Sequence, residues 1–211
     1  MARTLACKIG YRYIDSGAMY RAVALYALKN GMIGDDNVID TDRLFNSLDR
    51  IRITFEKDSK GKQLTFLNGI NVENDIREMA VSRIVSQIAS FSRVREEMVN
   101  QQRAMGLDGG IVMDGRDIGT TVFPDAQLKI FVTAAPEVRA ERRYEELLKK
   151  GECVDFNEVL ENVKKRDYLD EHRDVSPLRK AEDAILLDNT SMSVDEQNSF
   201  LLKLFQRAVG E

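Results

Sequence analysis

Polar residues with a glycine follow the apolar, alternating segment 11–14, at a position where an open parallel sheet binds ligands. Asp15, Ser16 and Gly17 open a helical pattern that carries Arg21 about one turn in. A hydroxyl, free N–H groups at a helix N-terminus and a guanidinium are suited to binding an anion. Taken alone, however, this tripeptide is more typical of an ordinary Asp or Ser helix cap, so both interpretations stay open.

A denser polar cluster follows the apolar run 111–113. The segment Asp114-Gly115-Arg116-Asp117-Ile118-Gly119 places two carboxylates and an arginine around two glycines. A carboxylate that ends a buried strand can hold a hydrated Mg²⁺, although a salt bridge within a turn would also explain these charges. Because several charged or conformationally special positions coincide, we favour a functional interpretation.

Three charged residues near position 170 share one helical spacing. Arg166, Asp170 and Arg173 stand at i, i+4 and i+7, so they form one polar stripe if the helix continues to Arg173. All three side chains would then reach a single ligand. Taken alone, the stripe is more simply a solvated helix face with an i, i+4 ion pair.

Other arginines allow the same two interpretations. They are Arg139, Arg142 and Arg143 on a predicted helix, and Arg93 and Arg95 on an earlier one. Gly151 could hinge the later helix as a mobile cover over a polyphosphate, but Glu141, Glu145 and Glu146 could instead pair with its arginines on the surface. Many arginines without a catalytic histidine suit phosphate recognition and phosphoryl transfer, which depend on positioning and charge neutralisation.

The composition excludes several other classes of protein. The 211 residues include 31 basic and 35 acidic side chains, a net charge of -4 that argues against a broad nucleic-acid surface. Cys7, Cys153 and His172 are the only cysteines and histidine, which leaves no zinc site or disulfide framework. Apolar runs are too short to span a membrane, and no apolar signal core follows Met1, so we expect a cytoplasmic protein that binds no membrane.

Apolar spacing predicts the elements that must position these residues. Strands are expected over 11–14, 111–113, 128–132 and 184–187, and helices over 2–9, 18–29, 76–88, 93–105, 137–150, 155–170 and 195–208. Residues 51–72 instead alternate, with Asn68-Gly69 as a two-residue hairpin signal. We therefore predict an α/β fold, a parallel sheet with helices on both faces and an inserted antiparallel meander.

Three segments, in order along essentially the whole chain, resemble the bacterial cytidylate kinases. They are Asp15-Ser16-Gly17-Ala18-Met19-Tyr20-Arg21, the block from Asp114 to Ala126, and Lys165-Arg166-Asp167 with Asp170 and Arg173. The second of these, Asp-Gly-Arg-Asp-x-Gly-Thr-x-Val-Phe-Pro-Asp-Ala, is highly specific. The meander at 51–72 is similar to the insertion of the bacterial form.

The resemblance implies a P-loop kinase fold that transfers the γ-phosphate of ATP to CMP or dCMP with Mg²⁺. It implies a core of 1–30, 107–138 and 174–211, a monophosphate-binding domain of 31–106 and a helical lid of 139–173. CMP, dCMP and ATP are the implied partners, and we expect a monomer. A kinase for another small phosphate acceptor stays an alternative.

Matching the motifs position by position implies roles for individual residues. The cytosine would be read by Ser86, Arg95 and Asp117, because a carboxylate accepts from the exocyclic amine while donors meet N3 and the carbonyl. The ribose would contact Arg166 and Asp170, and the CMP phosphate Arg21, Arg116 and Arg173 with Ser16, Gly17 and the adjoining Tyr20. Arg139 and Arg143 would contact the ATP phosphates, so that with Arg116 and Arg173 they form the catalytic set. Asp114 would hold Mg²⁺ through water.

The front of the chain departs from the family pattern. Members of the family begin with a strand and a glycine-rich loop ending in Gly-Lys-Ser/Thr, followed by the helix that residues 1–9 resemble. None of the 13 glycines opens such a loop, and Gly61-Lys62 is followed by Gln63. The triphosphate cradle and a central strand are therefore missing from this sequence.

Two explanations of this departure are open. Met1 could be an internal methionine just after the loop, in which case the full-length gene product is the active enzyme. A truncation could instead leave an inactive chain that binds CMP but not ATP. We favour the first, because the predicted phosphate and base residues downstream are intact.

Overall fold

A computed structural model describes residues 1–34, 36, 38–59, 61–149 and 151–210. The chain divides into two compact units, which we describe separately. The N-terminal unit comprises Ala2 and Ala6–Gly115, and the C-terminal unit comprises Met1, Arg3–Leu5 and the chain from Arg116 onward. Helix α1, Ala2–Ile9, begins the chain as predicted and ends at Gly10, whose φ of 72° is accessible to glycine.

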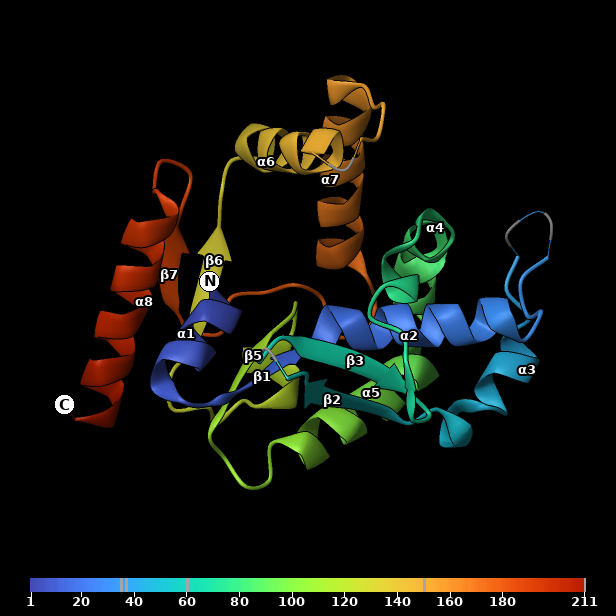
Figure 1. The fold of residues 1–211 in the computed structure, drawn as a ribbon, viewed down its shortest axis with the longest axis horizontal. Coiled ribbons are helices and arrows are strands. Elements are labelled where there is room, and N and C mark those ends of the chain that lie inside the picture. Colours follow the sequence, from blue (N-terminus) through green and yellow to red (C-terminus); the bar gives the residue numbers. More distant parts are fainter. Residues whose placement is uncertain (35, 37, 60, 150, 211) are drawn as a thin grey trace. The chain divides into compact units, whose positions relative to one another are not determined.

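A parallel strand pair followed by a buried helix forms the centre of the N-terminal unit (Figure 1). Strands β1 (Arg12–Asp15) and β5 (Ile111–Asp114) pair in parallel, with Asp15 opposite Asp114. Helix α2, Ser16–Lys29, starts two residues earlier than predicted. The reason is that Asp15 does not break the chain but caps the helix, with its carboxylate accepting from Ala18 N at 2.9 Å.

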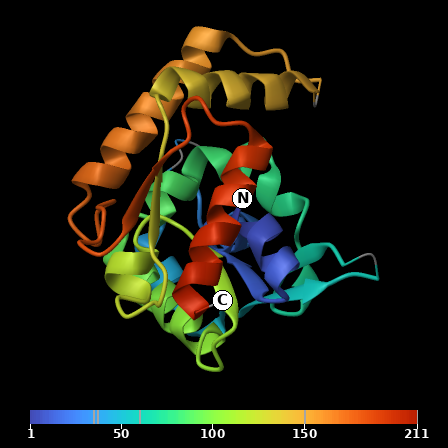
Figure 2. The same cartoon turned by 90° about the vertical axis from the view of Figure 1, so that its left-hand side faces the viewer.

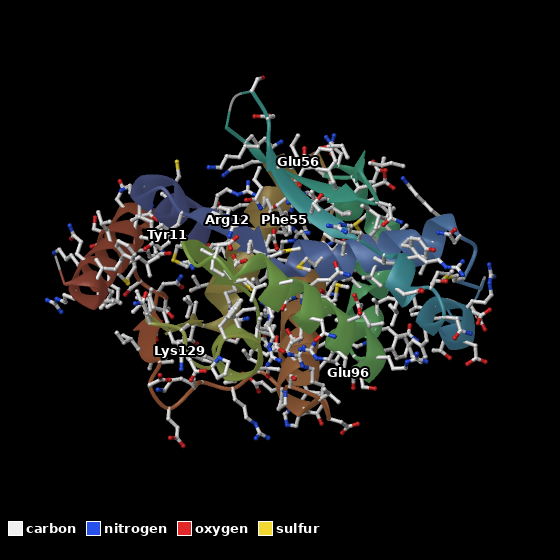
Figure 3. The ribbon with its side chains drawn as sticks, turned by 90° about the horizontal axis from the view of Figure 1, so that it is seen from below. Tyr11, Arg12, Phe55, Glu56, Glu96 and Lys129 are labelled. Atoms are coloured by element: carbon white, nitrogen blue, oxygen red, sulfur yellow. The ribbon has the colours of Figure 1, made fainter. Side chains whose placement is uncertain are left out.

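The predicted antiparallel meander is confirmed. Strands β2 (Ile53–Lys57), β3 (Gln63–Leu67) and β4 (Ile70–Asn71) form a three-stranded sheet in sequence order. Asn68 and Gly69 join β3 to β4 with φ values of 50° and 80°, which the tight hairpin turn requires. Side chains alternate as expected of a half-buried strand: Phe55 packs against the core and Glu56 is exposed (Figure 3).

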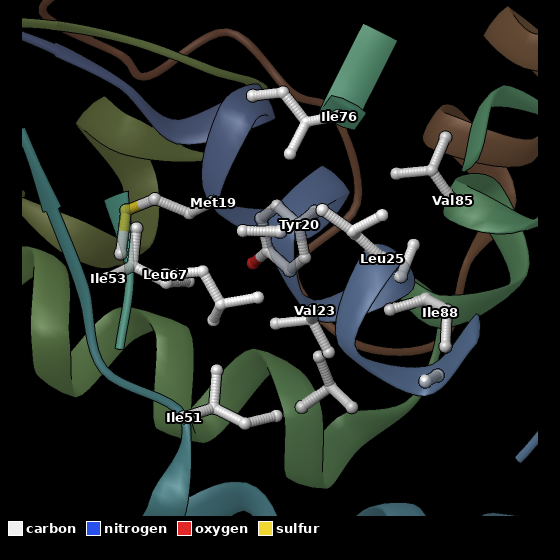
Figure 4. Packing of buried hydrophobic residues seen from close by; sticks show 14 of the residues in the cluster. Met19, Tyr20, Val23, Leu25, Ile51, Ile53, Leu67, Ile76, Val85 and Ile88 are labelled. Atoms are coloured by element: carbon white, nitrogen blue, oxygen red, sulfur yellow. The ribbon is translucent and has the colours of Figure 1, made fainter. Parts of the chain in front are cut away.

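Three further α-helices, α3 (Thr41–Phe45), α4 (Met79–Ile88) and α5 (Ser92–Met105), complete the described part of this unit. The helix predicted from residue 76 is interrupted, because Asp75–Arg77 forms a 3-10 turn and Glu78 is extended, with ψ of 154°. Apolar residues from α2, the meander and α4 meet in one core, seen in Figure 4. Met19 and Val23 are fully buried there, as the apolar face of a central helix should be.

The C-terminal unit contains the second parallel pair, β6 (Ile130–Thr133) with β7 (Ile185–Asp188). Helices α6 (Pro136–Lys149) and α7 (Phe156–His172) pack against each other in both views (Figures 1 and 2). The apolar part of their contact is a small cluster in which Tyr144 and Phe156 lie edge to face, 5.8 Å apart. Helix α8, Val194–Val209, begins at a capping box of Ser193 and Glu196.

A turn of π-helix, Ile118–Val122, follows the Asp114–Asp117 segment in the sequence. The two parallel pairs, the helices and the small antiparallel sheet confirm the predicted α/β class. The predicted end of one helix at Lys150 lies outside the described residues. Among the described helices, none combines the length and the apolar character needed to cross a membrane.

Candidate active site

Two carboxylates lie side by side where β1 and β5 end. Asp15 is engaged as the cap of α2, and Ser16 Oγ donates to the carbonyl oxygen of Asp114 at 2.7 Å. The Asp114 carboxylate accepts from the Tyr13 hydroxyl, at 3.0 and 2.9 Å for its two oxygens. This edge therefore presents one carboxylate fixed in orientation, next to a helix N-terminus.

The first turns of α2 carry three more of the predicted residues. Gly17 lies close to the capping side chain, since a Cβ there would be 3.2 Å from Asp15 Oδ1. Arg21, half-buried, donates to Ser82 Oγ at 3.0 Å and to the carbonyl oxygen of Ile76 at 3.4 Å. The guanidinium is thus anchored by Ser82 of α4 and by the 3-10 turn that precedes this helix.

Two of the three arginines of α5, Arg93 and Arg95, differ in burial. Arg95 is 2% exposed, with its guanidinium over the Tyr20 ring at 5.5 Å and a hydrogen bond to Ala89 O at 3.1 Å. Arg93 is exposed and lies over the Phe45 ring at 5.2 Å. Of these two arginines, Arg95 is the buried one, as expected of a group built into a binding site. Ser86, on α4, is exposed.

Four charged residues of the C-terminal unit form an alternating chain of arginines and carboxylates. Arg116 Nε donates to Asp170 Oδ2 at 2.8 Å, and Arg173 lies 3.6 Å from Asp170 Oδ1. A second Arg173 nitrogen lies 3.9 Å from Asp117 Oδ1. The Asp117 residue is 5% exposed and the Arg173 side chain 9%, so both charges are largely withdrawn from water.

The predicted stripe on α7 is not continuous. The helix ends at His172, and Arg173 is extended with ψ of 146°, so the i+7 position is not helical. Arg173 reaches Asp170 from outside the helix, and its Nε donates to Ser176 O at 2.7 Å. Asp170 therefore accepts from Arg116 on one side and forms an ion pair with Arg173 on the other, and the structure joins the stripe to Arg116, which spacing alone did not indicate.

Arg166 completes this cationic group. Although the residue is exposed overall, loss of hydration lowers the pKa of its guanidinium, as does repulsion from Arg116, while Asp170 opposes the shift. Arginine remains charged under any working condition. A site with several such cations is arranged for an anionic ligand.

The arginines of α6 each have a partner. Arg139 makes a bidentate pair with Asp167 of α7, at 2.8 and 2.6 Å, and this contact raises the pKa of Arg139 above its usual value. Arg143 pairs with Glu146 at 2.9 Å, which is the surface pairing that the sequence left open. Arg142 instead donates to Asn189, at 3.1 Å to Oδ1 and 2.9 Å to the backbone oxygen.

Comparison with known proteins identifies the group to which these features belong. The sequence model of a family described as cytidylate kinase matches residues 1–207. The chain belongs to this family. A cytidylate kinase of Bacteroides thetaiotaomicron is 59% identical over 212 residues, covering 100% of this chain and 92% of the relative. That of Porphyromonas gingivalis is 54% identical, covering 100% and 91%.

A more distant member of the family matches over nearly the same length of the chain. A cytidylate kinase of Flavobacterium johnsoniae is 48% identical over 210 residues, covering 99% of this chain and 91% of the relative. The resemblance predicted from three segments is therefore confirmed over nearly the whole chain. The cytidylate kinase family is a family of nucleotide-binding transferases, so the arginine clusters lie in a protein that handles phosphates.

The family implies Mg²⁺, and the residues present fit it in a limited way. Asp114 offers one oriented carboxylate, an oxygen ligand of the kind that Mg²⁺ takes. Within the described residues no three acidic, histidine or cysteine side chains are grouped as a metal cage. This donor set suits an ion that keeps several waters and takes its other ligands from phosphates.

Three positions that hold the site were missed in the sequence. Tyr13 orients Asp114, Ser82 anchors Arg21, and Asp167 engages Arg139. The Tyr13 contact had a signal, because Tyr13 and Asp15 lie on the same side of β1. The other two contacts join elements 61 and 28 residues apart, which spacing along one chain does not reveal.

Proposed function

We propose that this protein transfers the γ-phosphate of ATP to CMP or dCMP, giving CDP or dCDP and ADP. The observation that carries the proposal is the chain Arg116–Asp170–Arg173–Asp117, which alternates guanidinium and carboxylate groups. Phosphoryl transfer needs positioned cations rather than a strong base, and a nucleoside monophosphate offers hydroxyls and an anion to such a chain.

The base would be read by Asp117 with Arg95 and Ser86. A carboxylate accepts from the exocyclic amine of cytosine, whereas uracil presents a carbonyl oxygen at that position and would meet repulsion. Asp117 is 5% exposed and Arg95 is 2% exposed, so neither is strongly solvated and each requires a partner. Arg173 lies 3.9 Å from the Asp117 carboxylate and provides the opposite charge beside it.

The ribose and phosphate would bind the remaining arginines. We assign the sugar hydroxyls to Asp170 and Arg166, and the CMP phosphate to Arg21, Arg116, Arg173, Ser16, Gly17 and the adjoining Tyr20. Asp170 already accepts from Arg116, forms an ion pair with Arg173, and has lone pairs left for a hydroxyl donor. The CMP phosphate would take over part of the neutralisation of Arg116 from the Asp170 carboxylate. CMP binding would therefore exchange one ion pair for another.

The donor phosphates would contact Arg139 and Arg143 of α6. Arg139 is held by Asp167 and Arg143 by Glu146, so both guanidinium groups are preplaced on one helix. Bound Mg²⁺ would neutralise charge on the transferring phosphates, with Asp114 holding it through water. We assign residues 139–173 to a lid, 31–106 to monophosphate binding, and 1–30, 107–138 and 174–211 to the core, and expect a monomer.

A second candidate function is favoured by one observation. The 211 residues contain no Gly-x-x-x-x-Gly-Lys-Ser/Thr motif, the loop that cradles a triphosphate. This sequence, taken alone, would then bind CMP without turning it over. The residues proposed to bind CMP would act in the same way in both candidate functions. Binding of ATP is therefore the property that distinguishes the two functions.

Calorimetry and a coupled assay of ADP formation separate these functions. The 211-residue chain is titrated with CMP and with ATP, and ADP release is followed with both nucleotides and Mg²⁺. CMP binding with turnover supports the kinase, and CMP binding without ATP binding or turnover supports the second function. Absence of saturable CMP binding contradicts both.

A further inference from the structure

Lys129 lies immediately before β6 and is labelled in Figure 3. Its side chain is 9% exposed, which is unusual for a strongly hydrated ammonium group and requires partners for its charge. The Nζ atom donates to both carboxylate oxygens of Asp183, at 2.7 and 2.9 Å, and to the carbonyl oxygen of Pro124. One side chain thus joins the loop after the π-helical turn to the segment before β7.

The backbone of Lys129 is held as well as the tip of its side chain. Its carbonyl oxygen accepts from Ile185 N at 2.9 Å, which extends the β6–β7 pairing by one residue. Between these fixed ends the stem passes Gly119, where a Cβ would lie 3.1 Å from Lys129 Cδ. Because both ends are held, the stem has little freedom to move, and the turn packs directly against it.

Asp117 is attached to this same turn. Its carbonyl oxygen accepts from Thr121 N at 2.9 Å and from Val122 N at 3.3 Å, both within the π-helical turn Ile118–Val122. π-Helical turns are rare and occur frequently at functional sites. The backbone position of Asp117 therefore depends on how the turn is held, and Lys129 holds it at Gly119 and Pro124.

We propose that Lys129 is a positioning residue for base selection: through Gly119 and Pro124 it fixes the turn that places the Asp117 carboxylate. The inference rests on the proposed function, in which Asp117 reads cytosine. Lys129 itself would touch neither substrate. Its loss would let Asp117 move away from the exocyclic amine, and recognition of the base would weaken more than binding of the sugar and phosphate.

The ratio of UMP to CMP dissociation constants tests this role, because general destabilisation leaves that ratio unchanged among folded molecules. Lys129→Met keeps the stem and removes the ammonium group. We expect it to lower the ratio about 10-fold, the scale of one well-placed hydrogen bond. Lys149→Met is the matched control, because the Lys149 side chain is 80% exposed and makes only a long contact with Glu145, at 3.8 Å. It should leave the ratio unchanged.

Two further variants cover the case in which Lys129→Met does not fold. Asp183→Asn removes the counter-ion of Lys129. Because the Asp183 side chain is itself 65% exposed, this change should lower the ratio by less than Lys129→Met does. Gly119→Ala places a methyl group against the fixed stem and should also lower it. If a folded variant of Lys129, Asp183 or Gly119 keeps the UMP-to-CMP ratio of the unsubstituted chain, the inference is overturned but the proposed function is not. Equal binding of CMP and UMP by the unsubstituted chain overturns the proposed function, and the inference with it.

Discussion

Arg116 Nε donates to Asp170 Oδ2 at 2.8 Å, joining residues 54 positions apart within the C-terminal unit. Asp170 also lies 3.6 Å from Arg173, so one carboxylate holds two guanidinium groups. The Arg116 side chain is 44% exposed and depends on this pair, whereas the Arg173 side chain is 9% exposed and also donates to Ser176 O at 2.7 Å. Asp170 is therefore the carboxylate that both cations share.

Asp170→Asn removes the charge that holds both arginines. We expect the free energy of unfolding to fall by about 1 kcal/mol, because the pair with Arg116 is partly screened by solvent. CMP affinity should fall about 10-fold and dCMP affinity by less, since a charged acceptor for the 2′-hydroxyl is lost. Urea unfolding and calorimetry measure these effects, with Asp174→Asn, an exposed neighbour, as control. Equal losses for CMP and dCMP would contradict the ribose role.

Asp117→Asn replaces the proposed acceptor by an amide of the same shape. CMP affinity should fall by about 10- to 100-fold, because a charge-assisted hydrogen bond to the exocyclic amine is weakened. UMP affinity should stay the same or rise, since the amide can donate to the uracil carbonyl. Competition titrations with both nucleotides give the comparison. A variant that weakens CMP and UMP equally would show that Asp117 acts on the fold rather than on the base.

Arg139 and Asp167 hold α6 to α7 through a bidentate pair whose side chains are 35% and 29% exposed. Asp167→Asn should reduce the free energy of unfolding by about 0.5 kcal/mol at low salt, and by less in 1 M salt, where such pairs are screened. Urea unfolding at both salt concentrations measures this. The control Glu145→Gln affects only an exposed contact at 3.8 Å and should change stability less. A loss that is independent of salt would contradict an electrostatic origin.

The capping box of α8 predicts a pH dependence. Hydrogen bonds from Ser193 lower the pKa of Glu196, so the folded state favours the ionised carboxyl. The resulting stability is present above the unfolded pKa of about 4.3 and is lost as the pH falls through the lower, folded value. Unfolding curves of Glu196→Gln and the unsubstituted chain should differ at neutral pH and converge in acid. The exposed Glu182→Gln serves as control, and a gap that persists in strong acid would contradict the assignment.

Local signals predicted most of the fold. The Asn68-Gly69 hairpin, the parallel strands and seven helical segments were indicated by residue spacing and turn chemistry, which act over a few residues. The exceptions are also local. Apolar residues continue at helical spacing across Glu78, so the spacing did not indicate that this residue is extended. Asp15 was interpreted as a break between strand and helix, because helix caps and turns use the same residue types.

The site was less accessible to sequence reasoning. Spacing placed Arg166, Asp170 and Arg173 together, and Asp170 with Arg173 does form a pair in the structure. It did not join them to Arg116, because that contact depends on how distant segments fold back. The resemblance to the cytidylate kinases implies that these residues share one site, which stays a prediction. The roles of individual residues remain predictions, for which the structure supplies partners and distances.

Titration of the 211-residue chain with CMP and UMP tests the central claim most directly, because it asks whether this chain recognises the cytosine base. We predict saturable, one-to-one binding of CMP and at least 10-fold weaker binding of UMP, as expected when an acceptor carboxylate faces the wrong base. No saturable binding of CMP, or equal affinity for the two nucleotides, would contradict the account.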